Sequence, residues 1–340
     1  MAFSDRLVAA WYAPGLTPLT AALLPLSLLA HAAMSIRRWA YRQGLLRATA
    51  LPVPVVVVGS VVIGGVGKTP LVRALVAALQ EHGWRPGVVS RGYGGKSGAP
   101  RAVRPGDDPA VVGDEPLLIA ADKLPVWVGR DRVAAAQALL AAHPDCDVLV
   151  ADDGLQHYAL RRDFEIAVID EARRLGNGHM LPAGPLREPH SRLAHVDALV
   201  RLCAGDSAAP SHDGSGRDSV MTHEPLPWRN LARPQAVADP AAWRAGVVHA
   251  VAGIGNPARF FELLRRLGLD PVCHAFADHH RYRPEELRLP EATVILMTEK
   301  DAVKCAAFAD LRCWCLPIRA RIDPALVARL ERSIHGRQAA

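Results

Sequence analysis

Paired cysteines are missing from this chain, and aromatic residues are scarce. The six cysteines stand apart without any CxxC spacing, and Phe, Trp and Tyr make up 5% of the residues. A zinc site or a disulfide framework is therefore not indicated, and buried or free thiols in a reducing compartment fit best. Cys313 and Cys315 alternate around Trp314 as neighbours on a strand would. Since no aromatic-basic RNA-binding signature is present, we expect no nucleic-acid partner.

Charged residues are missing near the beginning of the chain. No acidic residue occurs between Asp5 and Glu81, and the segment from Leu7 to Ile36 also lacks Lys and Arg. Its central part, residues 16–34, is rich in Leu and Ala and approaches the length of a membrane span. Prolines within the segment interrupt a helix, so a shallow, partly inserted anchor fits as well as a straight span. A signal peptide and a buried helical hairpin of a soluble fold are the alternatives.

Cationic and aromatic residues follow this apolar segment at once. They are Arg37, Arg38, Trp39, Tyr41, Arg42 and Arg47. Such residues are typical of a membrane interface, and arginines favour its cytoplasmic side. We therefore expect residues 1–48 to form an N-terminal membrane anchor with a basic interface segment.

The composition of the whole chain suits a globular protein with an anionic partner. Half of the 340 residues are hydrophobic and 22% are charged, which allows two compact domains. The formal charge of +6 fits phosphates, nucleic acid or an acidic lipid surface. Composition does not choose among these partners.

A strand, a glycine-rich loop and a helix follow one another after residue 52. Residues 53–59 form a β-branched run typical of a buried parallel strand, and residues 69–82 have the leucine spacing of a helix. Between them lies a phosphate-binding loop that we expect to hold ATP through Gly64, Gly65, Val66, Gly67, Lys68 and Thr69. Lys68 can reach the β- and γ-phosphates, and the Thr69 hydroxyl can bind Mg²⁺. The strict motif has a glycine where this chain has Val62.

Two aspartates end an apolar run further along the chain. Residues 147–151 lead into Asp152, Asp153 and Gly154. A strand that ends in a carboxylate beside a phosphate-binding loop is the Walker-B arrangement for Mg²⁺. Because adjacent strand residues point in opposite directions, one aspartate should face the metal and the other should act from the turn. Asp-Asp-Gly alone is more typical of a turn, so the upstream loop is what favours a metal site.

Several further segments combine charged residues with flexible backbone. They are SRGYGG at 90–95, GDEP at 113–116, DDGLQH at 152–157, PAGPLREP at 182–189, AGIGNP at 252–257, FADHH at 276–280 and TEKDAVK at 298–304. In this order they resemble the tetraacyldisaccharide 4′-kinases, the lipid A 4′-kinase family of Gram-negative bacteria. The resemblance extends from the apolar N-terminus to about Arg319, and the family's loop also lacks the first glycine of the strict motif.

The resemblance implies a fold and a reaction. The family fold has two α/β/α domains, the first of which is P-loop NTPase-like with a parallel sheet, joined by a small β linker, and an N-terminal helix engages the bilayer. The reaction transfers the γ-phosphoryl group of ATP, with Mg²⁺, to the 4′-hydroxyl of tetraacyldisaccharide 1-phosphate at the cytoplasmic face of the inner membrane. The expected partners are therefore this glycolipid and inner-membrane lipids, with no obligate protein partner.

The resemblance also implies roles for individual residues. The catalytic base matches Asp114, and the histidine that supports it matches His279, with His280 as the fallback. Glu115, Asp152 and Asp153 would manage Mg²⁺ and the water around it. The implied contacts to phosphate or substrate are Arg91, Gln156 and Arg187.

The pattern of strands and helices divides the chain into four ranges. We expect the anchor at 1–48, a P-loop kinase domain at 49–203, a flexible loop or linker at 204–244, and a second α/β domain at 245–340. The strands of the first domain are expected near 54–58, 86–90, 148–151, 165–169 and 198–202. In the second domain we expect a helix at 257–267, a strand at 293–297, a helix near 301–308 and a solvated helix after Asp323. Gly253 and Gly255 are interpreted as a close strand-to-helix turn.

Two other function classes share some of these features. A membrane-associated P-loop NTPase that uses hydrolysis as a switch would need the loop and the Asp-Asp strand. It would not need Asp114 and His279 to cooperate across domains. A non-catalytic module that binds anionic lipid or nucleic acid would fit the charge, but it gives no reason for the order of Lys68, Thr69 and Asp152.

Overall fold

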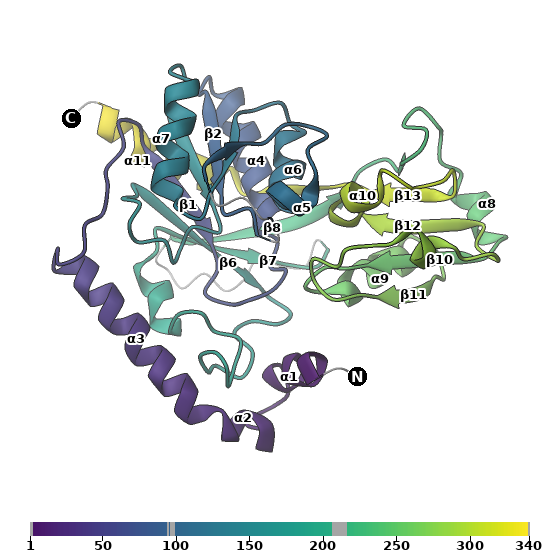
Figure 1. Cartoon of the computed structure of the whole chain (residues 1–340), viewed down its shortest axis with the longest axis horizontal. Coiled ribbons are helices and arrows are strands. Elements are labelled where there is room, and N and C mark those ends of the chain that lie inside the picture. The colour runs from purple at the N-terminus through teal and green to yellow at the C-terminus, as the bar shows by residue number, and fades with distance from the viewer. Residues whose placement is uncertain (1–2, 94, 96–98, 206–215, 339–340) are drawn as a thin grey trace.

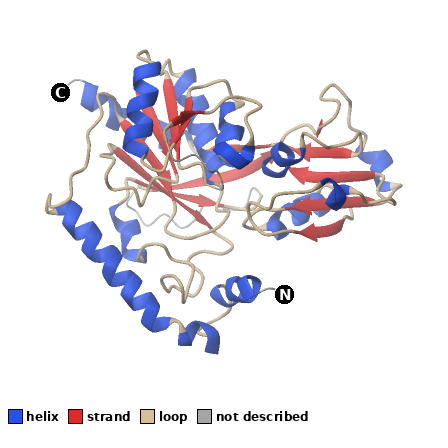
Figure 2. Cartoon of the chain, in the orientation of Figure 1, coloured by secondary structure: helices blue, strands red, loops and turns tan. Residues whose placement is uncertain are grey.

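The computed structural model describes residues 3–93, 95, 99–205 and 216–338, which form two sheets flanked by helices (Figures 1 and 2). The larger sheet has nine strands in the order β14-β8-β7-β6-β1-β5-β2-β4-β3. The smaller sheet has five in the order β11-β10-β12-β13-β9. Gly94 and residues 206–215 of the flexible loop or linker predicted at 204–244 lie outside the described residues.

The strands of the larger sheet are parallel except at its two edges. There β3 pairs antiparallel with β4, and β14 pairs antiparallel with β8. In chain order the strands are β1 (Val55–Gly59), β2 (Pro86–Ser90), β3 (Arg101–Ala102), β4 (Val126–Val128), β5 (Val148–Asp152), β6 (Phe164–Asp170), β7 (Ala198–Leu202), β8 (Asp218–Pro225) and β14 (Ile318–Ile322). The strands predicted from the sequence in this sheet are confirmed.

Strand β1 is buried on both faces, which explains its unbroken run of valines. Val56 and Val58 belong to one hydrophobic cluster with residues of helices α4 (Lys68–Glu81) and α11 (Pro324–Gln338). Val55 and Val57 belong to a second cluster with residues of α7 (Arg132–Ala142). Because Val58 pairs with Asp152 in parallel register, the phosphate-binding loop and the Asp-Asp turn leave the sheet at the same edge.

The smaller sheet is also mainly parallel and is buried on both faces. Its strands are β9 (Arg229–Asn230), β10 (Val248–Ala252), β11 (Val272–Ala275), β12 (Val294–Thr298) and β13 (Cys313–Leu316), and only β9 is antiparallel. The accompanying helices are α8 (Pro240–Arg244), α9 (Pro257–Arg266), η2 (Pro284–Leu287) and α10 (Glu299–Cys305). All six cysteines are free thiols, as predicted.

The chain passes twice between the two sheets, which corrects the predicted domain ranges. Strand β8 belongs to the larger sheet although it lies in the predicted linker, whereas β9 and α8 belong with the smaller one. The chain then returns from β13 to β14, which pairs with β8. Edge pairing of this kind depends on partners far apart in the sequence, so local patterns do not reveal it.

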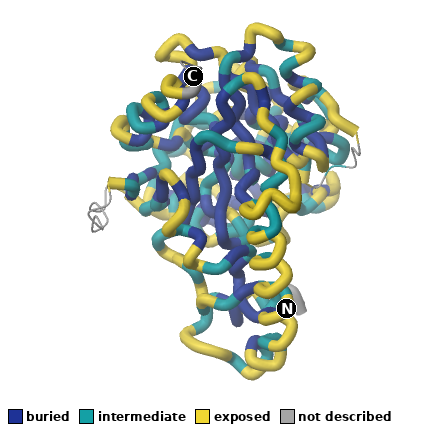
Figure 3. The backbone as a smooth tube through the Cα atoms, turned by 90° about the vertical axis from the view of Figure 1, so that its left-hand side faces the viewer, coloured by how far each residue is buried: buried dark blue, intermediate teal, exposed yellow. Residues whose placement is uncertain are grey.

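Some of the remaining helices pack against the larger sheet, and the first three form an N-terminal arm over residues 3–42. They are α5 (Pro109–Val112), α6 (Asp114–Ala120), η1 (His190–His195), α1 (Phe3–Trp11), α2 (Pro18–Ala22) and α3 (Leu24–Arg42). Figure 3 shows that the arm projects from the body and is largely exposed. Among the described residues, no helix is long and apolar enough to cross a bilayer. The continuous helix that a straight span over 16–34 requires is divided between α2 and α3.

The C-terminal helix is not the solvated helix that was expected. In α11 the side chains of Leu326, Leu330 and Ile334 are fully buried and belong to the cluster that covers the larger sheet. The helix therefore completes the first domain rather than extending the second.

Replacing Leu330 with alanine is expected to lower the free energy of unfolding by about 2–5 kcal/mol, because it leaves a cavity in a packed core. Urea unfolding of the purified protein measures this loss. The matched control is Arg332→Ala, an exposed position on the same helix, which should stay within about 0.5 kcal/mol of the wild type. Equal stability of the two variants would contradict the packing of α11.

Candidate active site

The predicted phosphate-binding loop connects β1 to α4. Gly64 and Gly67 have φ values of 103° and 88°, in the left-handed region that favours glycine. Val62, at the glycine position of the strict motif, does not have a positive φ. Its side chain is buried, and its backbone forms a β-bridge with Leu186. The loop therefore gains packing at this position and does not need glycine there.

Asp153 is held by two cations at the turn after β5. Arg187 donates two hydrogen bonds to its carboxylate at 2.9 and 2.8 Å, and the Lys68 ammonium lies 3.6 Å away. Burial raises the pKa of Asp153, but Lys68 and Arg187 outweigh it and hold the pKa well below its usual range. The residue has a φ of 47°, so it acts from the turn, as one of the two aspartates was expected to do.

Asp152 is fully buried in the neighbouring position and has the opposite character. Its Oδ2 lies 3.4 Å from the Ser90 hydroxyl, and its Oδ1 has no hydrogen-bond partner among the described residues. Burial, together with the nearby charges of Glu115 and Asp153, raises its pKa to about 7. A buried carboxylate oxygen without a partner fits a cation that neutralises it.

Glu115 and Lys300 form an ion pair between the two domains. The Lys300 Nζ lies 3.0 Å from Glu115, 3.0 Å from Asp278 and 3.4 Å from the His279 Nε2. Burial lowers the pKa of Lys300, but the surrounding carboxylates raise it by more than burial lowers it. The pKa is therefore above its ordinary value, and the ammonium group stays charged. The metal roles of Glu115 and Asp153 remain predictions, because cations pair with both carboxylates here.

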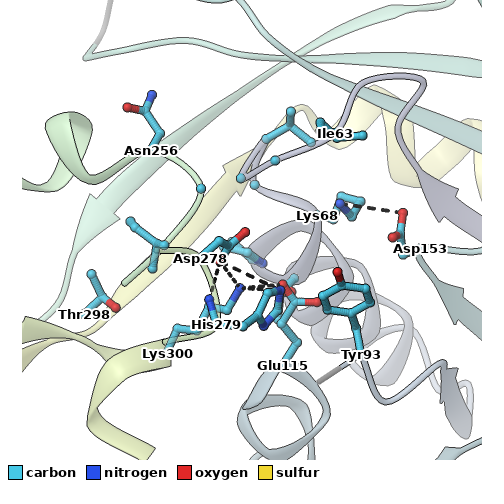
Figure 4. A pocket seen from close by; sticks show the side chains of 18 of the residues that line it. Ile63, Lys68, Tyr93, Glu115, Asp153, Asn256, Asp278, His279, Thr298 and Lys300 are labelled. Atoms are coloured by element: carbon cyan, nitrogen blue, oxygen red, sulfur yellow. Dashed lines mark hydrogen bonds and ion pairs between the residues drawn. The ribbon is translucent and has the colours of Figure 1, made fainter. Parts of the chain in front are cut away.

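Asp114 and His279 meet across the domain boundary. The His279 Nδ1 lies 3.0 and 3.1 Å from the two carboxylate oxygens of Asp114 (Figure 4 shows the histidine). Burial raises the pKa of Asp114, but the hydrogen bond from His279 and the charges of Lys300 and Lys304 lower it below its ordinary value. The carboxylate is therefore ionised at neutral pH.

The neighbouring histidine has a different partner. The His280 Nε2 lies 3.0 and 3.1 Å from the carboxylate oxygens of Glu286, within the second domain. Geometry therefore favours His279 over His280 as the residue that assists Asp114.

These residues surround a cavity of about 1430 Å³ between the domains. In Figure 4, Lys68 and Asp153 face Asn256 and Thr298 across it. The predicted substrate contacts Arg91, Gln156 and Arg187 all line this cavity, together with residues of α1. Asp114 and Asp152 lie behind the lining, where they are 4% and 0% exposed.

The two domains approach each other closely at two glycines. A Cβ added to Gly255 would lie 2.2 Å from the Gly65 backbone nitrogen. Gly255 lies in the turn between β10 and α9, where the sequence predicted a close strand-to-helix connection. A side chain at this position would push the second domain away from the phosphate-binding loop.

Comparison with known proteins identifies the family. A family model described as tetraacyldisaccharide-1-P 4′-kinase matches residues 19–335. The chain belongs to this family. The tetraacyldisaccharide 4′-kinase of Alkalilimnicola ehrlichii is 52% identical and aligns over 92% of each chain. That of Azoarcus sp. is 49% identical over 93% of this chain and 92% of its own.

A solved structure has the same fold as this family member. It is the "apo" form of LpxK from Aquifex aeolicus in complex with ATP, with 28% identity and a TM-score of 0.78. The match covers 93% of this chain and 99% of the other. The mixed α/β fold with parallel sheets and the family resemblance are thereby confirmed.

Some cavity residues of this 4′-kinase family member had no predicted role. Among them are Lys300, Arg132 and His223. Lys300 follows β12 and His223 lies near the carboxyl end of β8, so both are close to the edge of a sheet where ligands of α/β proteins bind. Arg132 begins a helix soon after β4 and donates a hydrogen bond to the Asp153 carbonyl oxygen at 3.0 Å. The signal for Lys300 was its place in the TEKDAVK segment at 298–304, whereas Arg132 and His223 had only their position near the edge of a sheet.

Replacing Asp152 with asparagine is expected to stabilise the metal-free protein, and the gain should grow from about pH 5 to about pH 8. In the wild type, the raised pKa means that the folded state keeps a proton that the unfolded state has lost. Stability therefore falls as the pH rises toward about 7, and an uncharged amide avoids this cost. Thermal unfolding at both pH values measures the gain. Exposed Asp145→Asn is the control, and a gain independent of pH would contradict the assigned pKa.

Proposed function

We propose that this protein is an ATP-dependent kinase that phosphorylates the 4′-hydroxyl of tetraacyldisaccharide 1-phosphate in lipid A synthesis. Its family membership supports the reaction and the glycolipid acceptor, and the ATP in the Aquifex aeolicus structure supports the donor. The observation that carries the proposal is the contact of Asp114 with His279 beside the phosphate-binding loop. A hydroxyl acceptor needs such a base, whereas a hydrolytic switch gives no reason for one that spans two domains.

In the proposed reaction, Asp114 takes the proton from the 4′-hydroxyl group. The hydroxyl oxygen then bonds to the γ-phosphorus while the bond between that phosphorus and the β-γ bridging oxygen breaks, and ADP leaves. The His279 Nδ1–H donates to Asp114 and so orients the carboxylate toward the hydroxyl. The low pKa of Asp114 keeps this base ionised before the acceptor binds.

Cations on the opposite side of the cavity hold the phosphates. Lys68, Arg132 and Arg187 all line the cavity and surround Asp153. Phosphate oxygens can replace the Asp153 carboxylate as partners of Lys68, since the Lys68 Nζ lies 3.6 Å from the Asp153 Oδ1, beyond hydrogen-bonding distance. The charge that develops in phosphoryl transfer is then met by groups already in place.

The donor set also fits Mg²⁺ held jointly by protein and nucleotide. Asp152 offers its unpartnered Oδ1, and Thr69 offers a hydroxyl at the first turn of α4. Among the described residues, no group of three His, Cys, Asp or Glu side chains could hold a metal by itself. Few protein ligands are typical of Mg²⁺ sites that include phosphates, and bound Mg²⁺ would neutralise the triphosphate.

The transfer of label from ATP to lipid tests this function. Protein incubated with γ-labelled ATP and Mg²⁺ is expected to label the 4′ position of tetraacyldisaccharide 1-phosphate, and only when this acceptor is present. Asp114→Asn should lower turnover by about 10²–10⁴-fold because it removes the base. Label that goes to inorganic phosphate regardless of acceptor would favour the hydrolytic switch.

A pair of histidine variants controls this assay. His279→Ala should lower turnover more than it weakens ATP binding, because His279 acts on the base rather than on the nucleotide. His280→Ala, one residue away, should leave turnover near the wild-type value. The reverse order would transfer the supporting role to His280.

We also propose that the N-terminal arm docks on the cytoplasmic face of the inner membrane. Leu28, Leu29 and Ile36 of α3 are 67%, 68% and 64% exposed, and Trp39 is 55% exposed. Exposed arginines, among them Arg37 and Arg42, accompany them. Apolar side chains can enter the lipid interface while arginines contact anionic head groups.

Replacing Leu28 and Leu29 together with serine is expected to weaken binding to anionic vesicles by about tenfold or more. Co-sedimentation with phosphatidylglycerol-containing vesicles measures the change. Val237→Ser is the matched control, because Val237 is 92% exposed but lies between β9 and α8, in the second domain rather than in the arm. Unchanged binding of the double variant would reject α3 as the docking element.

A further inference from the structure

The TEKDAVK segment at 298–304 carries a buried ion pair in addition to Lys300. Asp301 and Lys304 stand one turn apart on α10, where their charged groups are 2.8 Å apart and their side chains are 0% and 6% exposed. A buried ion pair often stabilises a protein no better than apolar side chains of the same volume, because both charges lose their water. Stability alone therefore does not account for this pair, and its contacts indicate a second role.

The pair holds the backbone of Gly253 through both of its polar groups. The Gly253 N–H donates to the two carboxylate oxygens of Asp301 at 3.2 Å each, and the Lys304 Nζ donates to the Gly253 carbonyl oxygen at 3.5 Å. Gly253 directly follows β10 and begins the turn in which Gly255 packs against the backbone of Gly65. The ion pair thus fixes the turn of the second domain that lies on the phosphate-binding loop.

Lys304 also faces the proposed base across the domain boundary. Its Nζ lies 3.9 Å from the Asp114 Oδ2, beyond hydrogen-bonding distance, so it acts on this carboxylate through its charge. The His279 Nδ1 contacts the same carboxylate at 3.0 and 3.1 Å. His279 lines the cavity, whereas Asp114 and the ion pair lie behind its described lining. The Lys304 ammonium group therefore holds the base from behind.

Lys300, one turn earlier on the same helix, occupies a different position. It lines the cavity and pairs with Glu115 and Asp278, so a ligand in the cavity can compete for its contacts. The partners of Lys304 lie behind the lining, where a ligand does not compete for them. Of the two lysines, Lys304 is therefore the one suited to a purely geometric role.

We propose that Lys304, anchored by Asp301, is a positioning residue for phosphoryl transfer that keeps Asp114 aligned with the phosphate-binding loop. This inference rests on the proposed function, because it takes Asp114 as the base and ATP as the donor. One ammonium group is shared by the carboxylate and the Gly253 turn, so the distance from the base to the γ-phosphate becomes fixed when the domains meet. A displacement of about 1 Å can cost about 100-fold in rate, so this distance matters.

Replacing Lys304 with methionine removes the ammonium group and keeps most of the side-chain volume. We expect kcat to fall by about 10- to 100-fold because the base loses its alignment, while the Kd of ATP and the KM of the glycolipid change by less than about threefold. Lys304→Arg keeps the charge and should recover part of the lost kcat. A normal kcat in Lys304→Met, or a loss found equally in the Kd of ATP, would overturn the positioning role.

A double variant separates the loss of stability from the loss of positioning. Lys304→Met alone leaves Asp301 buried without its cation, whereas adding Asp301→Asn removes both charges and keeps an oxygen that can accept from the Gly253 N–H. The double variant should regain thermal stability relative to Lys304→Met, but not kcat. Recovery of both would show that the pair supports only the fold.

Arg192→Met is the matched control for breaking a buried ion pair. Arg192 is 4% exposed, pairs with Glu165, and is not among the described residues that line the cavity. Its loss should lower thermal stability and leave the kcat of the folded protein near the wild-type value. An equal fall in kcat for Arg192→Met and Lys304→Met would make the effect of Lys304 a general one and reject the proposal.

A mutant cycle shows whether Lys304 acts through the base. In the Asp114→Asn background, Lys304→Met should lower kcat by less than about threefold further, because the group that it positions is already gone. A merely structural effect would multiply with the loss caused by Asp114→Asn, and that result would contradict the inference.

The same variants distinguish this inference from the proposed function. If Asp114→Asn lowers turnover as expected and Lys304→Met does not, only the positioning role fails. If the wild type transfers no label to tetraacyldisaccharide 1-phosphate, or if Asp114→Asn retains full turnover, the proposed function or its base fails instead.

Discussion

The site depends on a polar contact between the two domains, in which His279 from one meets Asp114 from the other. Neither domain holds the arrangement alone, because the carboxylate comes from α6 and the imidazole from the loop after β11. Lys300 reinforces the contact through Glu115 and Asp278. Buried charges cost free energy unless they are paired. Separating the two domains would leave Asp114 and Glu115 without these partners, so the pairs favour the contact between the domains.

Two adjacent aspartates obtain opposite properties from their surroundings. Asp153 has two cationic partners and a depressed pKa, whereas Asp152 has an unpartnered oxygen and a raised pKa. The difference arises because β5 ends between them: Asp152 is still in the sheet and Asp153 has turned out into the cavity. One stretch of sequence thus provides one carboxylate that is paired with cations and one that is buried with a free oxygen.

The N-terminal arm is attached beside the cavity by hydrogen bonds to residues 180–182. Trp11 of α1 donates a hydrogen bond to the Pro182 carbonyl oxygen at 2.9 Å, and α1 lines part of the cavity. Ser27 of α3 bonds to the Met180 carbonyl oxygen at 2.7 Å, which attaches the arm to the same segment. An arm fixed next to the site, with apolar side chains still exposed, suits a kinase whose donor is soluble and whose acceptor is not.

The sequence alone determined what depends on neighbours along the chain. The valine run of β1, the glycines of the loop, the helix after Lys68 and the Asp-Asp turn all follow from local conformational preferences, and the structure has each of them. Tertiary structure decided the pairing of β14 with β8, the partner of each histidine and the position of His223 beside Gly67. These features join residues far apart in the sequence, and their energies come from burial and charge that exist only once the domains have packed.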